Sequence, residues 1–110
     1  RCSAGDEYLW KWHGFAGGSP HRGRVLNANG YDRFAFSFVE NSVVDISITS
    51  VEGIRLLTLE QTMIPDDADL RIYLECGEGW AFYLTNLKSR LEGGIDLRNR
   101  NERITGVVNA

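Results

Sequence analysis

The sequence predicts an all-β fold, a single antiparallel β-sandwich or small barrel of about seven or eight short strands. Two observations carry this prediction. Apolar and polar residues alternate with a period of two through much of the chain, which is typical of strands with one buried face. Turn-forming residues separate these segments at intervals of about 8–12 residues. A chain of 110 residues has room for one core, so residues 1–110 are expected to form a single domain.

Two central strands carry the clearest alternation. Residues 31–39 and 42–50 each place three apolar side chains on one face, and Glu40-Asn41 joins them. The inward-facing residues are Phe34, Phe36 and Phe38 in the first strand and Val44, Ile46 and Ile48 in the second. Residues 53–61 form a third candidate strand, bounded in front by Glu52-Gly53.

A second hairpin is predicted further along the chain. Residues 69–76 alternate with Leu70, Ile72, Leu74 and Cys76 inward. Residues 80–87 alternate with Trp80, Phe82 and Leu84 inward. Gly-Glu-Gly at 77–79 supplies the turn between them.

The two ends are less regular. Residues 6–12 are expected to form a strand and the glycine-rich residues 13–23 a loop. Residues 88–94 fit a helical turn that stops at Gly93-Gly94, and residues 95–110 fit one or two short terminal strands.

The charge distribution excludes some partners. The net charge is −3, so nucleic-acid binding through overall charge is not expected. Residues 40–78 hold nine acidic residues against two basic ones, which indicates either an ordinary solvated surface or an acidic face that attracts a basic partner. No apolar run approaches the roughly 18 residues that a membrane span requires.

The two cysteines point to a compartment. Cys2 and Cys76 lack the spacing of a metal site, and the chain has no initial methionine. We expect them to form a disulfide that ties the N-terminus to the middle of the chain. A removed signal peptide and a secreted or periplasmic location would account for both features.

Three sets of residues are candidate sites. Tyr8, Trp10 and Trp12 share one face of a strand, where they either belong to the core or form an exposed surface for a sugar or a protein. The arginines Arg98, Arg100 and Arg103 could contact an acidic protein or glycan through bidentate bonds. One loop, here called the acidic loop, contains three aspartates that could hold calcium: Asp66, Asp67 and Asp69. Their spacing differs from the order of ligands in an EF-hand loop.

Catalytic signals are weak. His13 and His21, with Asp6, Glu7 and Asp32, are the available acid–base groups, and no nucleophile lies in a recognisable motif. The chain is therefore expected not to be an enzyme and to bind no cofactor or metal.

Two segments resemble known families, the first in its strand pattern and the second in its spacing. Residues 22–50 are similar to the opening strands of prepeptidase C-terminal-type sandwiches and periplasmic lysozyme inhibitors. Residues 95–108 are similar to an element of cyanovirin-type lectins. Each segment covers less than a third of the chain, and neither resemblance implies a site residue.

The sequence therefore predicts a secreted or periplasmic binding domain that recognises another protein, as an inhibitor, immunity protein, adhesin or effector does. The alternative is a lectin-like carbohydrate-binding module that uses the strand aromatics, and a small hydrolase is a third possibility. A homodimer is conceivable if an aromatic edge strand is uncovered.

Overall fold

The computed structural model describes residues 1–12, 20–101, 103 and 104. The chain divides into two compact units. The first, here called the sheet unit, comprises Arg1–Lys11 and Pro20–Ala68. The second, the helix unit, comprises Trp12–Ser19 and Asp69–Ala110.

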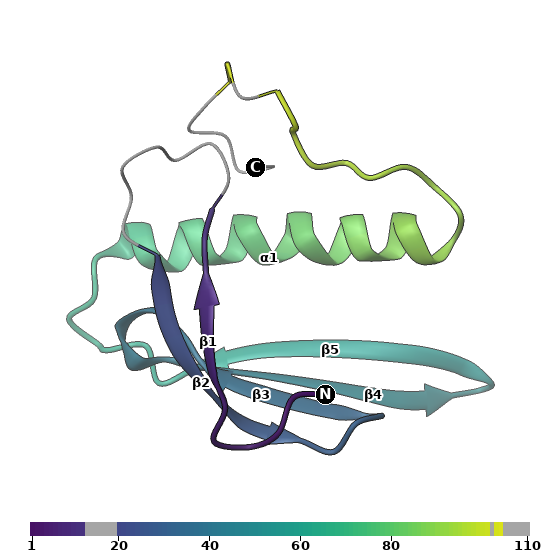
Figure 1. Cartoon of the computed structure of the whole chain (residues 1–110), viewed down its shortest axis with the longest axis horizontal. Helices are drawn as coiled ribbons and strands as arrows, with labels where there is room; N and C mark the ends of the chain where they lie inside the picture. Colours follow the sequence, from purple (N-terminus) through teal and green to yellow (C-terminus); the bar gives the residue numbers. More distant parts are fainter. Residues whose placement is uncertain (13–19, 102, 105–110) are drawn as a thin grey trace. The chain divides into compact units, whose positions relative to one another are not determined.

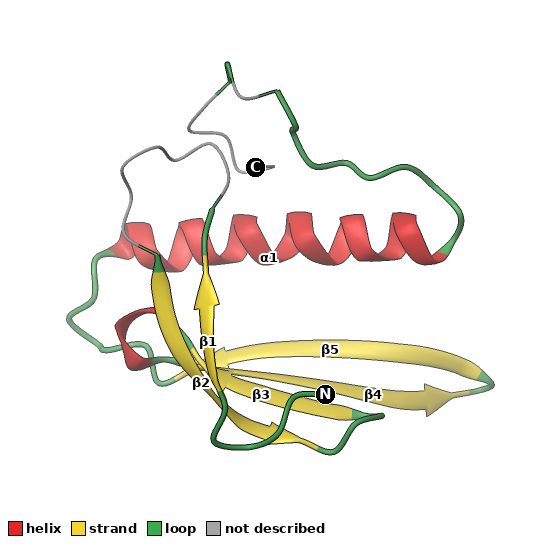
Figure 2. Ribbon diagram, in the orientation of Figure 1, coloured by secondary structure: helices red, strands yellow, loops and turns green. Residues whose placement is uncertain are grey.

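The sheet unit is a five-stranded antiparallel meander (Figures 1 and 2). Its strands lie side by side in chain order, and a short 3-10 turn, η1 (Val39–Asn41), links the third strand to the fourth. The strands are β1 (Glu7–Trp10), β2 (His21–Ala28), β3 (Arg33–Ser37), β4 (Val43–Val51) and β5 (Ile54–Thr62).

One face of this sheet is apolar, as the sequence predicts. Phe36 lies opposite Val25 on one side and opposite Val44 on the other, and all three are buried. Phe34 is paired with Ile46, so the inward-facing sets predicted for the two central strands do share a face. Val44 has no exposed surface at all, and Phe36 is only 5% exposed.

The turns of the sheet unit are stabilised by residues with positive φ and by side-chain hydrogen bonds. Glu52 (φ 49°) and Gly53 (φ 79°) form the two-residue β4–β5 turn, and the type I′ geometry suits the right-handed twist of the strands. In the β2–β3 turn, the side-chain oxygen of Asn29 accepts hydrogen bonds from three successive backbone N–H groups, those of Tyr31, Asp32 and Arg33. After η1, the buried hydroxyl of Ser42 donates to the Val39 carbonyl at 2.6 Å and accepts from the Gln61 amide at 2.9 Å.

The helix unit contains one long helix, α1 (Leu70–Leu91), where the sequence predicted a hairpin of residues 69–76 and 80–87. That prediction is wrong. The Asp69 carboxylate accepts the backbone N–H of Arg71 at 2.9 Å and so caps the first turn. Lys88 and Arg90 lie in the last turn, where cations are favourable, and Gly93 takes the left-handed conformation just beyond it.

The error has a physical cause. Alternation at Leu70, Ile72 and Leu74 coincides with a helical series in which Ile72, Cys76 and Trp80 are each four residues apart and half-buried. Glycine at 77 and 79 suggested a turn, but a helix tolerates it at a cost of about 1 kcal/mol per residue.

The protein is thus mostly β, with five strands and one helix among the described residues rather than a sandwich or barrel of seven or eight strands. Strand β2 was missed, since its first residues fall in the predicted loop 13–23, of which residues 13–19 lie outside the described part. The predicted strand at 6–12 is shorter, the turn at 88–94 is the end of α1, and residues 95–101 form no strand. The remainder of the predicted terminal strands falls mainly on residues outside the described part.

In the described part of the chain, no helix is both long and apolar enough to cross a bilayer.

Candidate functional site

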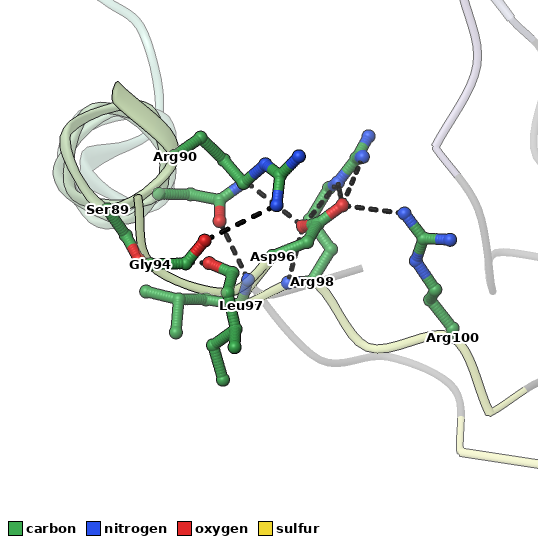
Figure 3. A network of polar contacts seen from close by, with 9 residues as sticks. Ser89, Arg90, Gly94, Asp96, Leu97, Arg98 and Arg100 are labelled. Carbon is green, nitrogen blue, oxygen red and sulfur yellow. Dashed lines mark hydrogen bonds and ion pairs between the residues drawn. The ribbon is translucent and has the colours of Figure 1, made fainter. Parts of the chain in front are cut away.

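The strongest candidate site lies in the helix unit, where the segment after α1 folds back onto the last turns of the helix (Figure 3). Asn86, the one buried residue of α1, holds this segment with both ends of its amide. Its side-chain oxygen accepts the backbone N–H of Leu97 at 2.7 Å, and its side-chain nitrogen donates to the Asp96 carboxylate at 3.2 Å. Residues 96 and 97 are therefore fixed relative to the helix.

The turn that allows this return depends on Gly94. Its backbone N–H donates to the Ser89 carbonyl at 2.7 Å, and a Cβ atom at position 94 would lie 2.5 Å from the Ser89 hydroxyl oxygen. The Ser89 hydroxyl in turn donates to the Ile95 carbonyl at 2.9 Å. Glycine is thus needed where the chain passes closest to the helix.

The Asp96 carboxylate binds two arginines of the same segment, Arg98 and Arg100 (Figure 3). The Nε of Arg98 donates to one carboxylate oxygen at 2.9 Å, and its Nη2 donates to the other oxygen. Arg100 donates from Nη2 to that second oxygen at 2.7 Å. The carboxylate is only 15% exposed, whereas the side chains of Arg98 and Arg100 are 49% and 74% exposed.

The electrostatics follow from these bonds. Hydrogen bonds from Arg98 and then Arg100 hold the pKa of Asp96 far below its ordinary value of 3.8, so it is ionised at any physiological pH. The same contact raises the pKa of Arg98 above its ordinary value. Burial raises the pKa of the nearby Tyr83 hydroxyl, and the positive charge of Arg98 opposes this rise.

Other basic residues flank this pair. Arg103 is exposed and its side chain makes no ion pair within the described residues, while its backbone N–H donates to the Asn101 side chain at 3.1 Å. Arg90 donates to the Gly94 carbonyl at 3.3 Å. Residues 88–103 hold five basic residues against three acidic ones, a local excess of two positive charges. We call Arg98, Arg100 and Arg103 the arginine cluster.

The hydrogen bonds from Arg98 and Arg100 to Asp96 predict how the stability of the fold depends on pH in the acid range. Because the pKa of Asp96 is lower in the folded chain than in the unfolded one, its stabilising effect is complete above about pH 4 and is lost as the pH falls further. The carboxyl ¹³C signal of Asp96 should therefore show no titration step between about pH 5 and about pH 3.

Two variants test this expectation. In an Arg98→Ala variant, the pKa of Asp96 should rise toward its ordinary range, because the arginine that donates the most hydrogen bonds to this carboxylate is gone. Arg24→Ala, in the sheet unit, should leave the Asp96 signal unchanged. A step near the ordinary value in the unmodified protein would show that the Asp96 contact does not form in solution.

The predicted aromatic ladder divides between the units, with Tyr8 and Trp10 in the sheet unit and Trp12 in the helix unit. The ring of Tyr8 contacts Phe36 edge-on at a centroid distance of 5.6 Å, and its hydroxyl donates to the Ser37 carbonyl. Trp10 contacts Phe38 at 5.5 Å. All three ladder residues are half-buried, so the ladder is neither a fully buried core layer nor an open stacking surface.

The acid–base candidates do not form a catalytic group around His21. The His21 ring packs between Tyr8 and Phe38, with centroids at 5.9 and 5.2 Å, and its buried Nε2 has no hydrogen-bond partner among the described residues. His13 lies outside the described residues. Glu7 forms an ion pair with Arg24 at 3.0 Å, and Asp6 accepts the backbone N–H of Ser3.

The acidic loop shows no metal-binding arrangement. Asp69 caps α1, while Asp66 and Asp67 are exposed. Within the described residues, no three His, Cys, Asp or Glu side chains converge as metal ligands.

No disulfide joins the two cysteines in the structure. Cys2 is exposed in the sheet unit, and Cys76 is half-buried on α1 rather than on the strand that the sequence predicted. The pairing of Cys2 with Cys76 stays a prediction.

The sheet unit also has an open pocket of about 310 Å³ beside the β2–β3 turn. Phe34, Ile46 and Ile48 contribute an apolar lining, and Arg1 and Asp32 contribute charged groups. The Arg1 guanidinium lies over Gly30, where a Cβ atom would be 2.9 Å from its Nη2. The pocket can accommodate a small apolar group, but its wide opening gives little enclosure.

Comparisons with known proteins give no further assignment: no family model, no curated protein and no solved structure matches this chain.

Sequence reasoning found the arginines of this site but missed the residues that position them. Asn86 lies in a segment predicted to be a strand, and Asp96 is not among the predicted site residues. The local signal was nonetheless present. Asp96 follows Gly93-Gly94 after one residue and precedes arginines at 98 and 100, both of which bind its carboxylate.

Proposed function

We propose that this chain is a non-catalytic, secreted or periplasmic binding domain that recognises an acidic surface of another protein. The observation that supports this most directly is the Asp96 carboxylate, which holds the guanidinium groups of Arg98 and Arg100 side by side while both remain exposed.

The guanidinium groups of Arg98 and Arg100 are preorganised, and this is the physical reason to expect that they bind carboxylates of a partner. An arginine that is free to rotate loses side-chain entropy when it binds, whereas these two already share a fixed partner. Each guanidinium has five N–H donors, and Asp96 occupies two on Arg98 and one on Arg100. The remaining donors can bind carboxylates in pairs, the geometry that arginine favours. Arg103 adds a third cation on the same segment.

The other two candidate functions have less support. A sugar-stacking surface needs open ring faces, but Tyr8 and Trp10 use part of theirs against Phe36 and Phe38. A hydrolase needs a base within reach of a nucleophile or water, and the neighbours of His21 are aromatic rings. An inhibitor, immunity protein, adhesin or effector remains the favoured type.

A fluorescein-labelled peptide of ten glutamates tests this function by fluorescence anisotropy. We expect it to bind and a matched lysine peptide not to bind. Arg98→Ala, Arg100→Ala and Arg103→Ala should each weaken binding by about two- to fivefold, the range for exposed ion pairs. Arg22→Ala, which removes an exposed arginine of the sheet unit, is the matched control and should change nothing.

Asn86→Ala separates positioning from charge. It leaves the net charge unchanged but removes both hydrogen bonds that hold residues 96 and 97, so peptide binding should weaken although no arginine is lost. Equal binding by all variants would contradict the proposed site. Red-shifted tryptophan emission that changes on addition of a neutral glycan, without peptide binding, would favour the carbohydrate-binding alternative.

The proposed location has its own test, because an exported protein is expected to hold its two cysteines as a disulfide. The protein is recovered from its native host, denatured without reductant and treated with iodoacetamide, and its mass is measured. We expect no added label, and two labels after reduction. Two labels without reduction would contradict the secreted or periplasmic location and leave the binding function untouched.

A further inference from the structure

The outer edge of the sheet unit at β5 is long and, within the described part of the chain, has no further strand beside it. β5 pairs with β4 along its whole length, from Val51–Ile54 to Val43–Thr62, and no strand of the described residues pairs on its other side. The opposite edge, β1, has four residues against nine in β5. Natural edge strands are usually short or carry proline or lysine, and β5 has neither residue.

The β4–β5 turn determines which backbone groups face outward. A two-residue turn makes Val51 and Ile54 the first hydrogen-bonded pair, and hydrogen-bonded pairs then alternate along an antiparallel ladder. The even-numbered residues of β5 therefore bond to β4. Arg55, Leu57 and Leu59 direct their N–H and C=O groups away from β4, where a further strand would find them.

Apolar side chains continue to the end of this hairpin. β3 pairs with β4 only as far as Ser47, so the hairpin extends beyond it (Figure 2). Val51 and Ile54 form a cross-strand pair on one face, and Leu56 is the next residue of β5 on that face. They are 53%, 71% and 53% exposed.

Two charged residues of β5 favour a particular order of charges in a strand that binds beside it. Arg55 lies near the start of β5 and Glu60 near its end, and residues 56–59 between them are leucine or threonine. An antiparallel segment complementary to this pattern has a basic residue first, then four uncharged residues, and then an acidic residue. Opposite charges across a strand pair stabilise it, and like charges destabilise it.

We propose that β5 binds an extended segment of a partner protein, which adds to the sheet as an antiparallel strand with a basic residue opposite Glu60 and an acidic residue opposite Arg55. Main-chain hydrogen bonds to Arg55, Leu57 and Leu59 hold the segment, and the exposed apolar residues of the hairpin select its side chains. This surface belongs to the sheet unit and the arginine cluster to the helix unit, and the two are tested with different peptides and variants, so either proposal can fail without the other.

The probe is a labelled peptide, Lys-Val-Thr-Thr-Val-Glu-Val, designed to lie antiparallel to residues 54–60. The control peptide exchanges its lysine and glutamate. We expect the first peptide to bind about tenfold more tightly than the control, because the control places like charges opposite both ends. Peptide binding should also slow hydrogen exchange at the amides of Arg55, Leu57 and Leu59, which NMR resolves one by one.

Protein variants make the test sharper. A double variant, Arg55→Glu with Glu60→Arg, should reverse the preference between the two peptides. Leu56→Lys should weaken both, and Leu74→Lys, at an exposed position of α1, should weaken neither. No binding at millimolar peptide, no preference between the peptides, or unchanged exchange at the three amides would overturn the proposal. So would slow exchange that depends on protein concentration without peptide, because a second copy would then occupy the edge.

Discussion

Replacement of Phe36 by alanine is expected to lower the free energy of unfolding by about 3–5 kcal/mol. Phe36 lies in the centre of β3, between Val25 of β2 and Val44 of β4, and is 5% exposed. Its ring also contacts those of Tyr8 and Phe34, each at a centroid distance of 5.6 Å. Alanine would leave a cavity among the buried side chains of β2, β3 and β4, and such cavities collapse only in part.

Urea unfolding followed by circular dichroism measures this loss. Tyr31→Ala is the matched control, because Tyr31 is an aromatic residue of the same unit that is 76% exposed, and it should change stability by no more than about 0.5 kcal/mol. A loss below about 1 kcal/mol for Phe36→Ala would mean that the apolar face of the sheet is not closely packed in solution.

Gly23→Ala is the second substitution with a large expected effect. Gly23 of β2 lies opposite Tyr8 of β1, and a Cβ atom at position 23 would be 2.3 Å from the Tyr8 ring. The ring passes over the bare glycine to reach the Ser37 carbonyl of β3. Adding one methyl group must displace the ring, at a cost of about 1–3 kcal/mol.

A double-mutant cycle distinguishes this clash from a general effect of alanine in a strand. In a Tyr8→Ala background, Gly23→Ala should cost much less, because the atoms that it would meet are gone. Gly77→Ala provides a control of opposite sign. A Cβ atom at position 77 has no neighbour within 4 Å, and position 77 lies within α1, so alanine should stabilise the protein by up to about 1 kcal/mol. Additive effects of Tyr8→Ala and Gly23→Ala would contradict the close approach.

The same residues show how much of the sheet could be predicted from the sequence. The Phe34–Phe36–Phe38 and Val44–Ile46–Ile48 alternations identified the inner face of β3 and β4 correctly, because period-two patterns with aromatic and β-branched residues fit few other structures. β2 was missed because His21, Gly23 and Val25 share its inner face. Only one of these is a large apolar residue, and the glycine is there for the Tyr8 ring, a contact between strands that no local pattern reveals.

The helix was missed for a different reason. In residues 70–84 both the two-residue and the four-residue spacings fall on apolar side chains, so periodicity alone could not decide. Asp69 before the segment and Lys88 and Arg90 near its end were the better indicators, because capping and charge placement distinguish a helix from a hairpin where hydrophobicity does not. The arginine cluster was found by composition, whereas its support from Asn86 depends on the helix and could not be predicted without it.

The single carboxylate shared by two guanidinium groups also has a consequence for kinetics. The arginine cluster and Asp96 together carry two net positive charges rather than three. The field that they project over a Debye length, about 8–10 Å in physiological salt, is correspondingly weak. A partner that docks here would gain little in encounter rate from long-range attraction, and its association rate would change little with ionic strength. Its affinity would instead depend on how long the complex lives, that is, on the dissociation rate set by short, directional hydrogen bonds at contact.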